Sequence, residues 1–220
     1  MFYSTEKRNH GLRHDPFKAL VVPRPIGWMS TVDVNGKPNL APFSFFNAIS
    51  DSPPMLMFSI ANGKDSLVNV LATGECTCSL ASKSLVDEMN MSSAAVNSEV
   101  NEFDLANLLI AKSSMVKPAR VANSPAAFEC RLWKAIELPI VEGRSGYTTV
   151  LVTVEGIHVD DQYINDGMVD VAAMEPLARL GYMDYAVVNK DNMFNLNRPK
   201  VDASGITATL QSGPWDGVYR

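Results

Sequence analysis

A strong turn signal at Asn35-Gly36 constrains how this chain can fold. Both residues accept a positive φ, which the tight primed turn of a β-hairpin requires. The preceding residues, 26–33, have the alternating sequence IGWMSTVD and are predicted to form a strand. We expect the chain to return through residues 39–46 as an antiparallel partner. Because Pro42 has no backbone N–H to donate, this partner strand is expected to be irregular there or to lie at a sheet edge.

Further short strands and helices are predicted along the chain. The expected strands are residues 55–61, 76–81, 126–141 and 148–161. The expected helices are one from Asp65-Ser66 to a C-cap at Gly74, two within 84–112 with Ser84 and Asp87 as a capping box, and a short helix or loop around Pro176. There is no βαβ rhythm and no G-x-G-x-x-G motif. The pattern predicts a mainly β, antiparallel barrel with helical excursions, in a single domain over residues 1–220.

Composition narrows the range of partners. The net charge is −5, so there is no electrostatic case for binding nucleic acid or an anionic membrane surface. No segment approaches the ~20 apolar residues of a membrane span, and the first residues lack the apolar run of a signal peptide. We therefore expect a cytoplasmic protein without a membrane or nucleic-acid partner.

The chain has three cysteines, an odd and sparse set that is typical of a reducing compartment. Cys76 and Cys78 lie in a segment that alternates like a strand, so both thiols are expected to face inward. Cys130 and three scattered histidines provide no convincing second half of a metal site, and no metal is expected.

Two segments carry groups suited to an anionic ligand. Lys64-Asp65-Ser66 lies at a predicted helix start, where backbone N–H groups, an ammonium and a hydroxyl can hold an anion. A capped helix beside a surface lysine is the alternative. Near the end of the first strand, Trp28 is followed by Ser30-Thr31, whose hydroxyls can bond a phosphate or sugar. Ordinary strand hydroxyls are the alternative here.

A third segment, residues 42–47, combines aromatic and polar side chains. A ladder interrupted at Pro42 leaves backbone groups free to bond a ligand. Phe45 and Phe46 offer flat apolar walls, and Ser44 and Asn47 offer directional polar contacts. A flavin needs this combination, although a hydrophobic cluster sealing one end of the barrel would have the same residues.

No catalytic side chain is predicted. His10, His14 and His158 are too scattered for a catalytic set, and His158 is expected to be a packed strand residue. No serine lies in a nucleophile motif. Hydride transfer to a flavin needs no protein acid, base or nucleophile, because the cofactor carries the chemistry.

The segment 14–54, HDPFKALVVPRPIGWMSTVDVNGKPNLAPFSFFNAISDSPP, closely resembles the flavin reductase-like, FMN-binding split-barrel family, in the branch that includes flavoredoxin. The likeness continues through KDSLVNVLATGE, NEFDLA, SPAAFEC, GIHVDD and PLARLGYMDY. It covers roughly residues 12–188, which leaves 190–220 as a C-terminal extension. The resemblance implies a six-stranded Greek-key split β-barrel and a homodimer with non-covalent FMN at the subunit interface.

The resemblance also implies roles for individual residues. Phosphate contacts are expected from the first strand and the helix start, namely Ser30, Thr31, Lys64, Asp65 and Ser66, and Trp28 is expected to be a further cofactor-binding residue. Ring contacts are expected from Ala41, Pro42, Ser44, Phe45, Phe46 and Asn47. Arg179 and Tyr185 match positions near the flavin or the dimer seam. Two residues depart from the pattern of many relatives: Ser79 replaces an Asn, and Tyr182 replaces a Gly and is expected to narrow the pocket mouth.

The family implies an NAD(P)H-dependent flavin reductase. Hydride would pass from nicotinamide C4 to flavin N5, and the electrons would go on to a small-molecule or protein acceptor. Two alternatives remain open at the level of sequence. The first is an FMN-containing electron carrier reduced by a protein partner, and the second is a non-enzymatic module that holds another cofactor, such as haem or F420.

Overall fold

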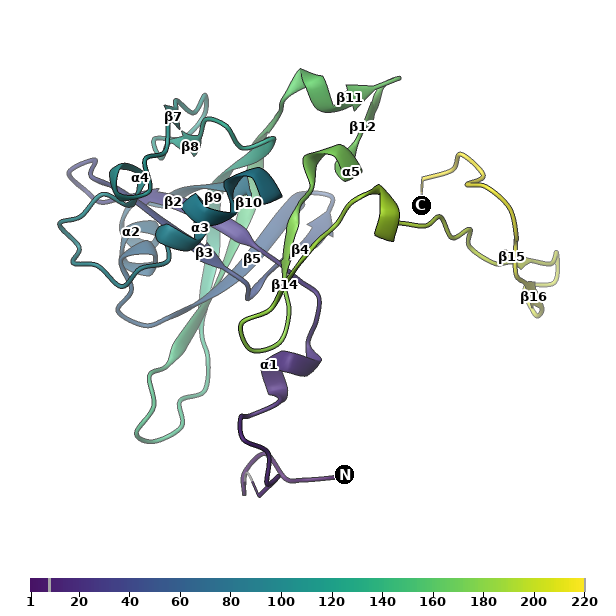
Figure 1. The fold of residues 1–220 in the computed structure, drawn as a ribbon, viewed down its shortest axis with the longest axis horizontal. Helices are drawn as coiled ribbons and strands as arrows, with labels where there is room; N and C mark the ends of the chain where they lie inside the picture. The colour runs from purple at the N-terminus through teal and green to yellow at the C-terminus, as the bar shows by residue number, and fades with distance from the viewer. Residues whose placement is uncertain (8, 220) are drawn as a thin grey trace.

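The computed structural model describes residues 1–7 and 9–219, and its centre is one strongly curved antiparallel sheet (Figure 1). The order of its seven strands is β3-β2-β6-β9-β10-β5-β4. Their bounds are β2 Gly27–Val32, β3 Pro38–Phe43, β4 Phe46–Asp51, β5 Pro54–Ala61, β6 Glu75–Leu80, β9 Ala126–Glu137 and β10 Tyr147–Val159. This arrangement confirms the predicted mainly β fold and the predicted strands, except that the strand expected over 39–46 is divided and β9 ends at Glu137, before the expected end at residue 141.

The two edge strands of this sheet, β3 and β4, are consecutive in sequence and are joined only by Ser44 and Phe45. The sheet must therefore curl until both edges reach the same corner. Packing there is tight, because a Cβ placed on Gly27 would lie 2.5 Å from Cδ2 of Phe46. The sheet has seven strands where six are expected, since the predicted strand over 39–46 ends at Phe43 and a new strand begins at Phe46.

The β2–β3 hairpin is present, but its turn differs from the prediction. Only Gly36 has a positive φ, of 85°, so the expected primed turn with a positive φ at Asn35 is wrong. The Asp33 carboxylate explains the difference, because its Oδ1 accepts hydrogen bonds from the backbone N–H groups of Asn35 and Lys37, each at 2.8 Å. The aspartate thus stabilises a longer turn that needs one left-handed residue only.

Pro42 is accommodated because β3 is an edge strand. Its pairing with β2 is regular, and Pro42 lies opposite Trp28 in that register. Two residues earlier, the backbone N–H of Leu40 points away from β2 and donates to Oε2 of Glu102 at 3.1 Å. By the alternation of a strand, the missing N–H of Pro42 falls on the same outer side, so no ladder hydrogen bond is lost.

Helix α2, Asp65–Thr73, crosses one end of the barrel between β5 and β6. Leu67 and Val70 insert into the barrel core, and Gly74 ends the helix with φ 73° and an N–H donated to the Val70 carbonyl at 2.9 Å. The predicted helix start and C-cap are both confirmed.

The barrel interior contains all three cysteines. Cys76, Cys78 and Cys130 are buried and unpaired by disulfides, as the alternation of the strand predicts for the first two. Burial raises the pKa of the Cys78 thiol well above its ordinary value, so this thiol stays neutral. Across residues 1–7 and 9–219 there is no group of three or more His, Cys, Asp or Glu side chains that could hold a metal.

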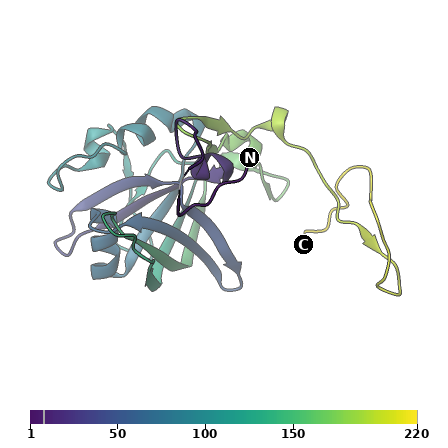
Figure 2. The same cartoon turned by 90° about the horizontal axis from the view of Figure 1, so that it is seen from below.

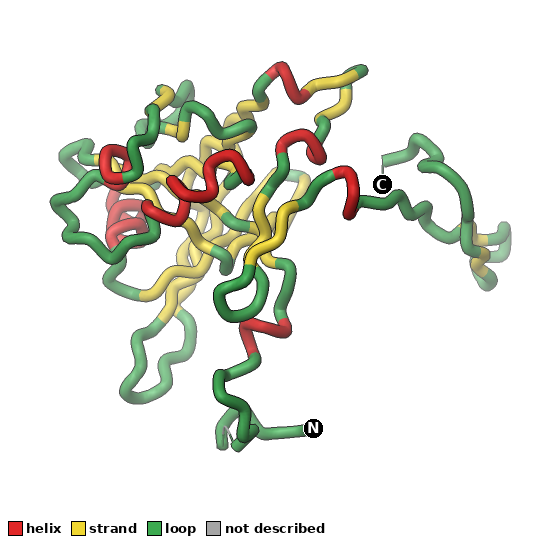
Figure 3. The backbone as a smooth tube through the Cα atoms, viewed as in Figure 1, coloured by secondary structure: helices red, strands yellow, loops and turns green. Residues whose placement is uncertain are grey.

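Short helices cover the outer face of the sheet (Figures 1 and 3). The 3-10 turn η1, Lys83–Leu85, leads into α3, Val86–Met91, and α4 spans Glu102–Leu105. The predicted capping box is wrong, because the Ser84 hydroxyl instead lies 3.0 Å from that of Ser82. The long helical pattern after Asn101 yields only α4, which packs Phe103 against a second apolar cluster with Trp28.

The remaining elements are small. They are α1 Phe17–Leu20, β1 Arg24–Pro25, β7 Ile110–Ala111, β8 Arg120–Val121, η2 Asp161–Tyr163, β11 Ile164–Asn165, β12 Met168–Val169, α5 Val171–Met174, β13 Leu177–Arg179, β14 Tyr185–Val187, η3 Lys190–Asn192, β15 Lys200–Val201 and β16 Ala208–Thr209. Strands β1, β13 and β14 form a separate sheet in the order β1-β13-β14. This sheet pairs β1, near the N-terminus, with the β13–β14 hairpin, which lies late in the sequence, just before the C-terminal extension.

Beyond η3 the chain extends away from the barrel (Figures 1 and 2), and most of residues 193–219 are exposed. None of the helices in the described ranges has the length and apolar character that a membrane span requires.

Candidate functional site

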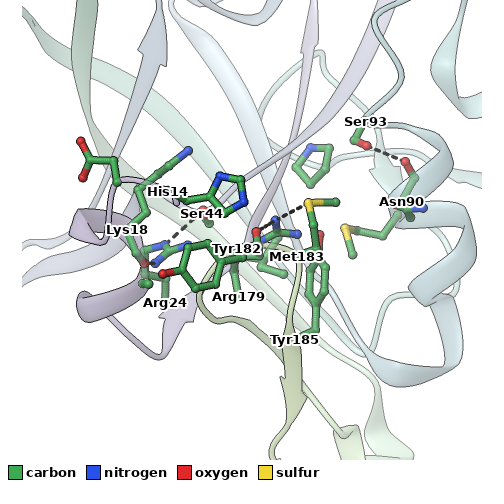
Figure 4. Close-up of a pocket in the computed structure, with 15 residues that line it drawn as sticks. His14, Lys18, Arg24, Ser44, Asn90, Ser93, Arg179, Tyr182, Met183 and Tyr185 are labelled. Carbon is green, nitrogen blue, oxygen red and sulfur yellow. Dashed lines mark hydrogen bonds between the residues drawn. The ribbon is translucent and has the colours of Figure 1, made fainter. Parts of the chain in front are cut away.

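A cavity of about 720 Å³ opens where the N-terminal segment, the β3–β4 corner, the end of α3 and the β13–β14 hairpin meet (Figure 4). Its lining combines basic, aromatic and apolar side chains. The lining residues are His14, Asp15, Lys18, Ala19, Arg24, Ile26, Pro42, Ser44, Met89, Asn90, Ser93, Arg179, Tyr182, Met183 and Tyr185. The volume lies within the range of sites for small molecules and cofactors.

Arg24 holds the walls of this cavity together. Its side chain is 7% exposed, and Nη1 donates to the carbonyl oxygens of Lys18 and Val21. Nη2 donates to the Leu180 carbonyl at 3.0 Å, and Nε donates to the Ser44 hydroxyl at 3.3 Å. One guanidinium therefore fixes the N-terminal segment, the hairpin and the β3–β4 corner relative to one another.

Arg179 lies opposite Arg24 in the pairing of β1 with β13, and its guanidinium carbon is 4.5 Å from the ring centre of Tyr185. Its Nη2 donates to the Tyr182 carbonyl and lies 3.4 Å from the sulfur of Met183. Burial, and then the positive charge of Arg179, lower the pKa of Arg24. Among the described residues neither arginine forms an ion pair with a carboxylate.

The charge of the cavity is opposite in sign to that of the chain. Lys18, Arg24 and Arg179 contribute three positive charges, and Asp15 is the single acidic residue in the lining. The net charge of the whole protein is −5. Since Coulomb attraction is strongest at short range and in a partly dry pocket, this cavity is suited to an anion in an otherwise anionic molecule.

Tyr182 and His14 form an aromatic rim on the cavity (Figure 4). Their ring centres are 5.7 Å apart, with an interplanar angle of 55°. Tyr182 has φ 52°, a left-handed conformation that is costly for a bulky residue. The neighbouring Gly181 presses the hairpin against α1, since a Cβ added there would lie 2.8 Å from Cβ of Ala19. Tyr182 therefore lies in the lining and is held there at a conformational cost.

The structure brings four of the predicted site residues into this cavity, namely Pro42, Ser44, Arg179 and Tyr185. The other predicted ring contacts, Ala41, Phe45, Phe46 and Asn47, are not among the lining residues. Phe46 packs against the barrel core, the ring of Phe45 lies 6.0 Å from that of Tyr147, Ala41 is half-buried in β3, and Asn47 is exposed.

The two predicted phosphate segments meet each other, but in a buried network. Asn39 Nδ2 donates to the Ser66 hydroxyl at 2.8 Å and lies 3.4 Å from that of Thr31. Asn69 Nδ2 donates to Thr31 at 3.2 Å. Both hydroxyls are therefore engaged within the chain. Lys64, which precedes α2, is exposed and makes no side-chain cap hydrogen bond.

Trp28 and Ser30 face the other side of β2. Trp28 is fully buried, and its Nε1 donates to the Ser92 hydroxyl at 2.9 Å. The buried Ser30 hydroxyl has no hydrogen-bond partner in the parts of the chain that the structure describes. Such an orphaned hydroxyl is a cost that a ligand or an ordered water can relieve.

Beside the Thr31 network lies a smaller hollow of about 170 Å³. Its charged lining consists of Asp33, Asp65 and Glu99 against Lys37 alone. This excess of carboxylates opposes a phosphate in the hollow itself. A phosphate near α2 would have to lie toward Lys64, outside the hollow.

Sequence reasoning missed the N-terminal part of the site. From the sequence alone, His14 is one of three scattered histidines, and no motif marks Lys18 or Arg24 as a site residue. A signal existed for Arg24, because a long cationic side chain between Pro23 and Pro25 has few local partners. Its four acceptors could not be inferred, since the Leu180 carbonyl lies 156 residues away in sequence.

Comparison with known proteins agrees with this architecture. The family model described as the flavin reductase like domain matches residues 19–178. An uncharacterized protein of Aquifex aeolicus is 37% identical over 168 residues, which covers 74% of this chain and 83% of that protein.

Solved structures show the same fold. Nitrilotriacetate monooxygenase component B from Bacillus cereus superposes with a TM-score of 0.81 at 24% identity, covering 89% of this chain and 98% of that chain. Flavoredoxin of Desulfovibrio vulgaris (Miyazaki F) superposes with a TM-score of 0.71 at 20% identity, covering 86% and 94%. These likenesses confirm the mainly β split-barrel fold.

The family match spans well over half of the 220 residues, and it includes the β3–β4 corner, Arg24 and the buried Thr31 network. On this evidence the chain belongs to the flavin reductase-like domain family.

Proposed function

We propose that this protein is an NAD(P)H-dependent flavin reductase that binds FMN non-covalently along β3, in a homodimer. The observation that carries the proposal is the basic and aromatic cavity at the β3–β4 corner, where Pro42 and Ser44 meet Arg179 and Tyr185. Bound FMN would supply the redox chemistry by accepting hydride from the nicotinamide and releasing electrons to a small-molecule or protein acceptor.

The residues present fit such a cofactor. Apolar groups from Ile26, Pro42 and Met89 supply a wall for a flat ring, and the Ser44 hydroxyl supplies a polar contact at its edge. At the other end of β3, the N–H groups at the start of α2 and the exposed Lys64 ammonium favour a phosphate. Asn39 and Pro42 are separated by roughly 10 Å of strand, so an elongated ligand along β3 reaches both ends.

The proposed FMN contacts are arranged along β3, from the phosphate end near α2 to the ring end near the β3–β4 corner. Ser30, Thr31, Lys64, Asp65 and Ser66 would serve the phosphate end, and Ala41, Pro42, Ser44, Phe45, Phe46 and Asn47 the ring end, with Arg179 and Tyr185 beside the ring. Trp28, which lies opposite Pro42, would support the ring end of β3. Thr31 and Ser66 would act by holding the start of α2 in place, since their hydroxyls already accept hydrogen bonds from Asn39 and Asn69. The orphaned Ser30 hydroxyl is the buried group in this set with bonding capacity to spare.

Two measurements test the proposal. Purified protein supplied with FMN should show the flavin absorbance bands after gel filtration, and anaerobic NADH or NADPH should bleach them. Protein that never retains flavin would refute FMN binding. Protein that retains flavin but is bleached by neither nucleotide would be an electron carrier reduced by a protein partner.

Lys64→Ala tests the phosphate end. Loss of one charge-assisted hydrogen bond should weaken FMN binding by roughly 1.5–3 kcal/mol. Lys200→Ala, which removes an exposed lysine of the C-terminal extension, is the matched control and should leave the affinity unchanged. Equal FMN affinities in both variants would show that the phosphate does not bind near the start of α2.

A further inference from the structure

We infer that residues 193–219 of the C-terminal extension pack on the β11–β12 hairpin of a second copy of this chain, so that the two copies of the dimer exchange these segments. The inference rests on the homodimer of the proposed function and adds the surfaces that meet in it. Family membership does not imply this contact, because the family match ends at residue 178 and the extension lies beyond it.

The extension has a defined shape of its own. In the turn of the β15–β16 hairpin, Oδ1 of Asp202 accepts a hydrogen bond from the backbone N–H of Ser204 at 3.1 Å. Asn197 closes a larger loop, because its Nδ2 donates to the Pro214 carbonyl at 2.8 Å and its Oδ1 accepts from the N–H of Asp216 at 3.0 Å. A two-stranded ribbon is marginally stable alone in water, so a segment with this internal order needs a surface to pack on.

The apolar side chains of the extension are the part of it that needs cover. Exposures above 80% occur at Phe194, Leu196, Ile206 and Leu210. In both views the extension runs away from the barrel of its own chain (Figures 1 and 2). Trp215 is less exposed, at 42%, and lines a small hollow inside the closed loop. Since contact of apolar surface with water is unfavourable, the four exposed side chains mark the face that a partner covers.

The β11–β12 hairpin and the adjoining turns η2 and α5 present a surface that is both apolar and acidic. Its exposed apolar side chains are Ile164, Met168, Val169 and Val171. Between residues 155 and 178 the chain has six acidic residues and no lysine or arginine. Asp160 and Asp170 cap η2 and α5. The carboxylates of Asp161 and Asp166 are exposed and accept no hydrogen bond from the described residues, so they are free to meet a cation.

The segment that leaves the barrel has the opposite charge. Residues 193–201, MFNLNRPKV, contain Arg198 and Lys200 and no acidic residue, interspersed with apolar side chains. A basic and apolar segment thus matches an acidic and apolar hairpin in both properties. In addition, β11–β12 and β15–β16 are both two-stranded sheets, whose open edges can be covered by main-chain pairing with an added strand.

A second copy of the chain is the partner that fits these surfaces. Within one chain the two surfaces stay apart, because the apolar side chains of both are exposed. Every chain carries one extension and one β11–β12 hairpin, so a two-fold dimer makes the contact twice and leaves neither surface uncovered.

A photo-crosslinker tests the contact in full-length protein. p-Benzoyl-phenylalanine replaces Phe194, which keeps an aromatic ring at an exposed position. Isotope-labelled and unlabelled protein are mixed in equal amounts, allowed to exchange subunits and irradiated. We expect crosslinks to peptides within residues 160–175 that join chains of different isotope label. The same probe at Val34, an exposed residue in the β2–β3 turn, is the matched control and should not reach this hairpin.

Crosslinks confined to one isotope would overturn the inference, because the extension would then fold back on its own chain. Crosslinks to another surface, or none at all, would overturn it as well. Sedimentation equilibrium and FMN retention are measured on the same samples. A dimer that retains FMN without the expected crosslink refutes the exchange and leaves the proposed function intact, whereas exchange in a protein that binds no flavin supports the inference while the proposed function fails.

Charge reversal tests why this hairpin is chosen. Lys200→Glu should lower the crosslink yield about threefold, as expected for the loss of an exposed charge pair. Adding Asp161→Lys should restore most of the yield, because the two surfaces again carry opposite charges. Arg144→Glu, at an exposed arginine between β9 and β10, is the matched control and should leave the yield unchanged. A yield that Lys200→Glu does not lower, or that Asp161→Lys does not restore, would overturn the assignment of this hairpin as the docking surface.

Discussion

Glu129 shows how one buried carboxylate can be stabilised by its hydrogen-bond partners. Its side chain is fully buried in β9, and it accepts hydrogen bonds from the backbone N–H groups of Ser114, Met115 and Val116. His158 Nε2 lies 2.5 Å from its Oε1, which agrees with the expectation of a packed histidine. Burial raises the pKa of Glu129, but the hydrogen bonds from His158 and the loop outweigh it and hold the pKa below its ordinary value.

Glu129→Gln should destabilise the fold by about 1–3 kcal/mol at pH 7, because the loop N–H groups lose a charged acceptor. A carboxyl with a lowered pKa contributes stability above its unfolded pKa, about 4.3, and that contribution is lost as the pH falls through the folded pKa. Urea unfolding of both proteins at pH 7 and pH 4 should therefore show a smaller difference at pH 4. Glu155→Gln, at an exposed glutamate of β10, should change stability little.

The pKa of Glu102 is shifted in the opposite direction, above its ordinary value. It accepts the outward N–H of Leu40 at 3.1 Å, and burial raises its pKa more than that hydrogen bond lowers it. Its stabilising contribution is therefore greatest below the unfolded pKa and is lost as the pH rises through the raised folded pKa.

Glu102→Gln should consequently reduce the loss of stability between pH 4 and pH 8, because an amide keeps an acceptor for Leu40 without a charge. Glu102→Ala should cost about 1–3 kcal/mol, since the buried N–H is left unpaired. Denaturant unfolding across this pH range measures both effects. A Gln variant with the same pH dependence as wild type would show that another group is responsible.

At the scale of elements, the cavity depends on how the β13–β14 hairpin meets α1. Gly181 touches Ala19 across this contact, with the closest approach to its absent Cβ being 2.8 Å. Gly181 does not have a positive φ, so glycine is required at this position because it has no side chain and not because of its backbone conformation. The hairpin and α1 also share the Arg24 clamp, which explains why residues so far apart in sequence form one wall.

Gly181→Ala should destabilise the protein by about 1–3 kcal/mol and weaken ligand binding in the cavity, because the added methyl separates the hairpin from α1. Adding Ala19→Gly should restore most of the loss, although Cα of Ala19 at 3.1 Å leaves some crowding. Thermal melts and ligand titrations of the single and double variants measure this rescue. A double variant no better than Gly181→Ala would place the cause elsewhere.

The strands and α2 could be predicted because their signals are local. Alternation placed β2, β5, β6, β9 and β10, and a glycine with a left-handed φ ended α2. The predicted type of the turn at Asn35 is wrong, because the Asp33 carboxylate, two residues earlier, accepts a hydrogen bond from the Asn35 N–H and stabilises a different turn. The split between β3 and β4 follows from the sheet curling on itself, which a local pattern does not encode.

The candidate site was predictable only in part, for a similar reason. The sequence indicated the β3–β4 corner and the start of α2, where unusual residues lie close together along the chain. It did not indicate Arg24 as a clamp, because its partners are backbone carbonyls of distant segments. It also did not reveal that the hydroxyls of Thr31 and Ser66 are used within the chain.

At the scale of the whole molecule, a band of apolar side chains on β9, β10 and their connection has no cover from the rest of the described chain. Trp133 is 61% exposed and Val141 is 68% exposed, and Ile136, Ile140 and Tyr147 continue the band. A patch of this kind is typical of a subunit interface, which accords with the proposed homodimer.

We expect sedimentation equilibrium to give twice the 24.0 kDa mass of the chain. Trp133→Glu should shift the protein toward the monomer, because a charge would be buried without a partner in the interface. Trp215→Glu, at an exposed tryptophan of the C-terminal extension, is the matched control. Dissociation by Trp215→Glu alone would place the contact on the extension instead.

Because all three cysteines are buried in the barrel core, the folded protein has no thiol that a reagent in solution can reach. One cysteine introduced at an exposed position such as Met183 would then be the only site that a maleimide dye can label in the folded protein. A fluorophore attached there would report cavity occupancy directly, without removing any native side chain from the core.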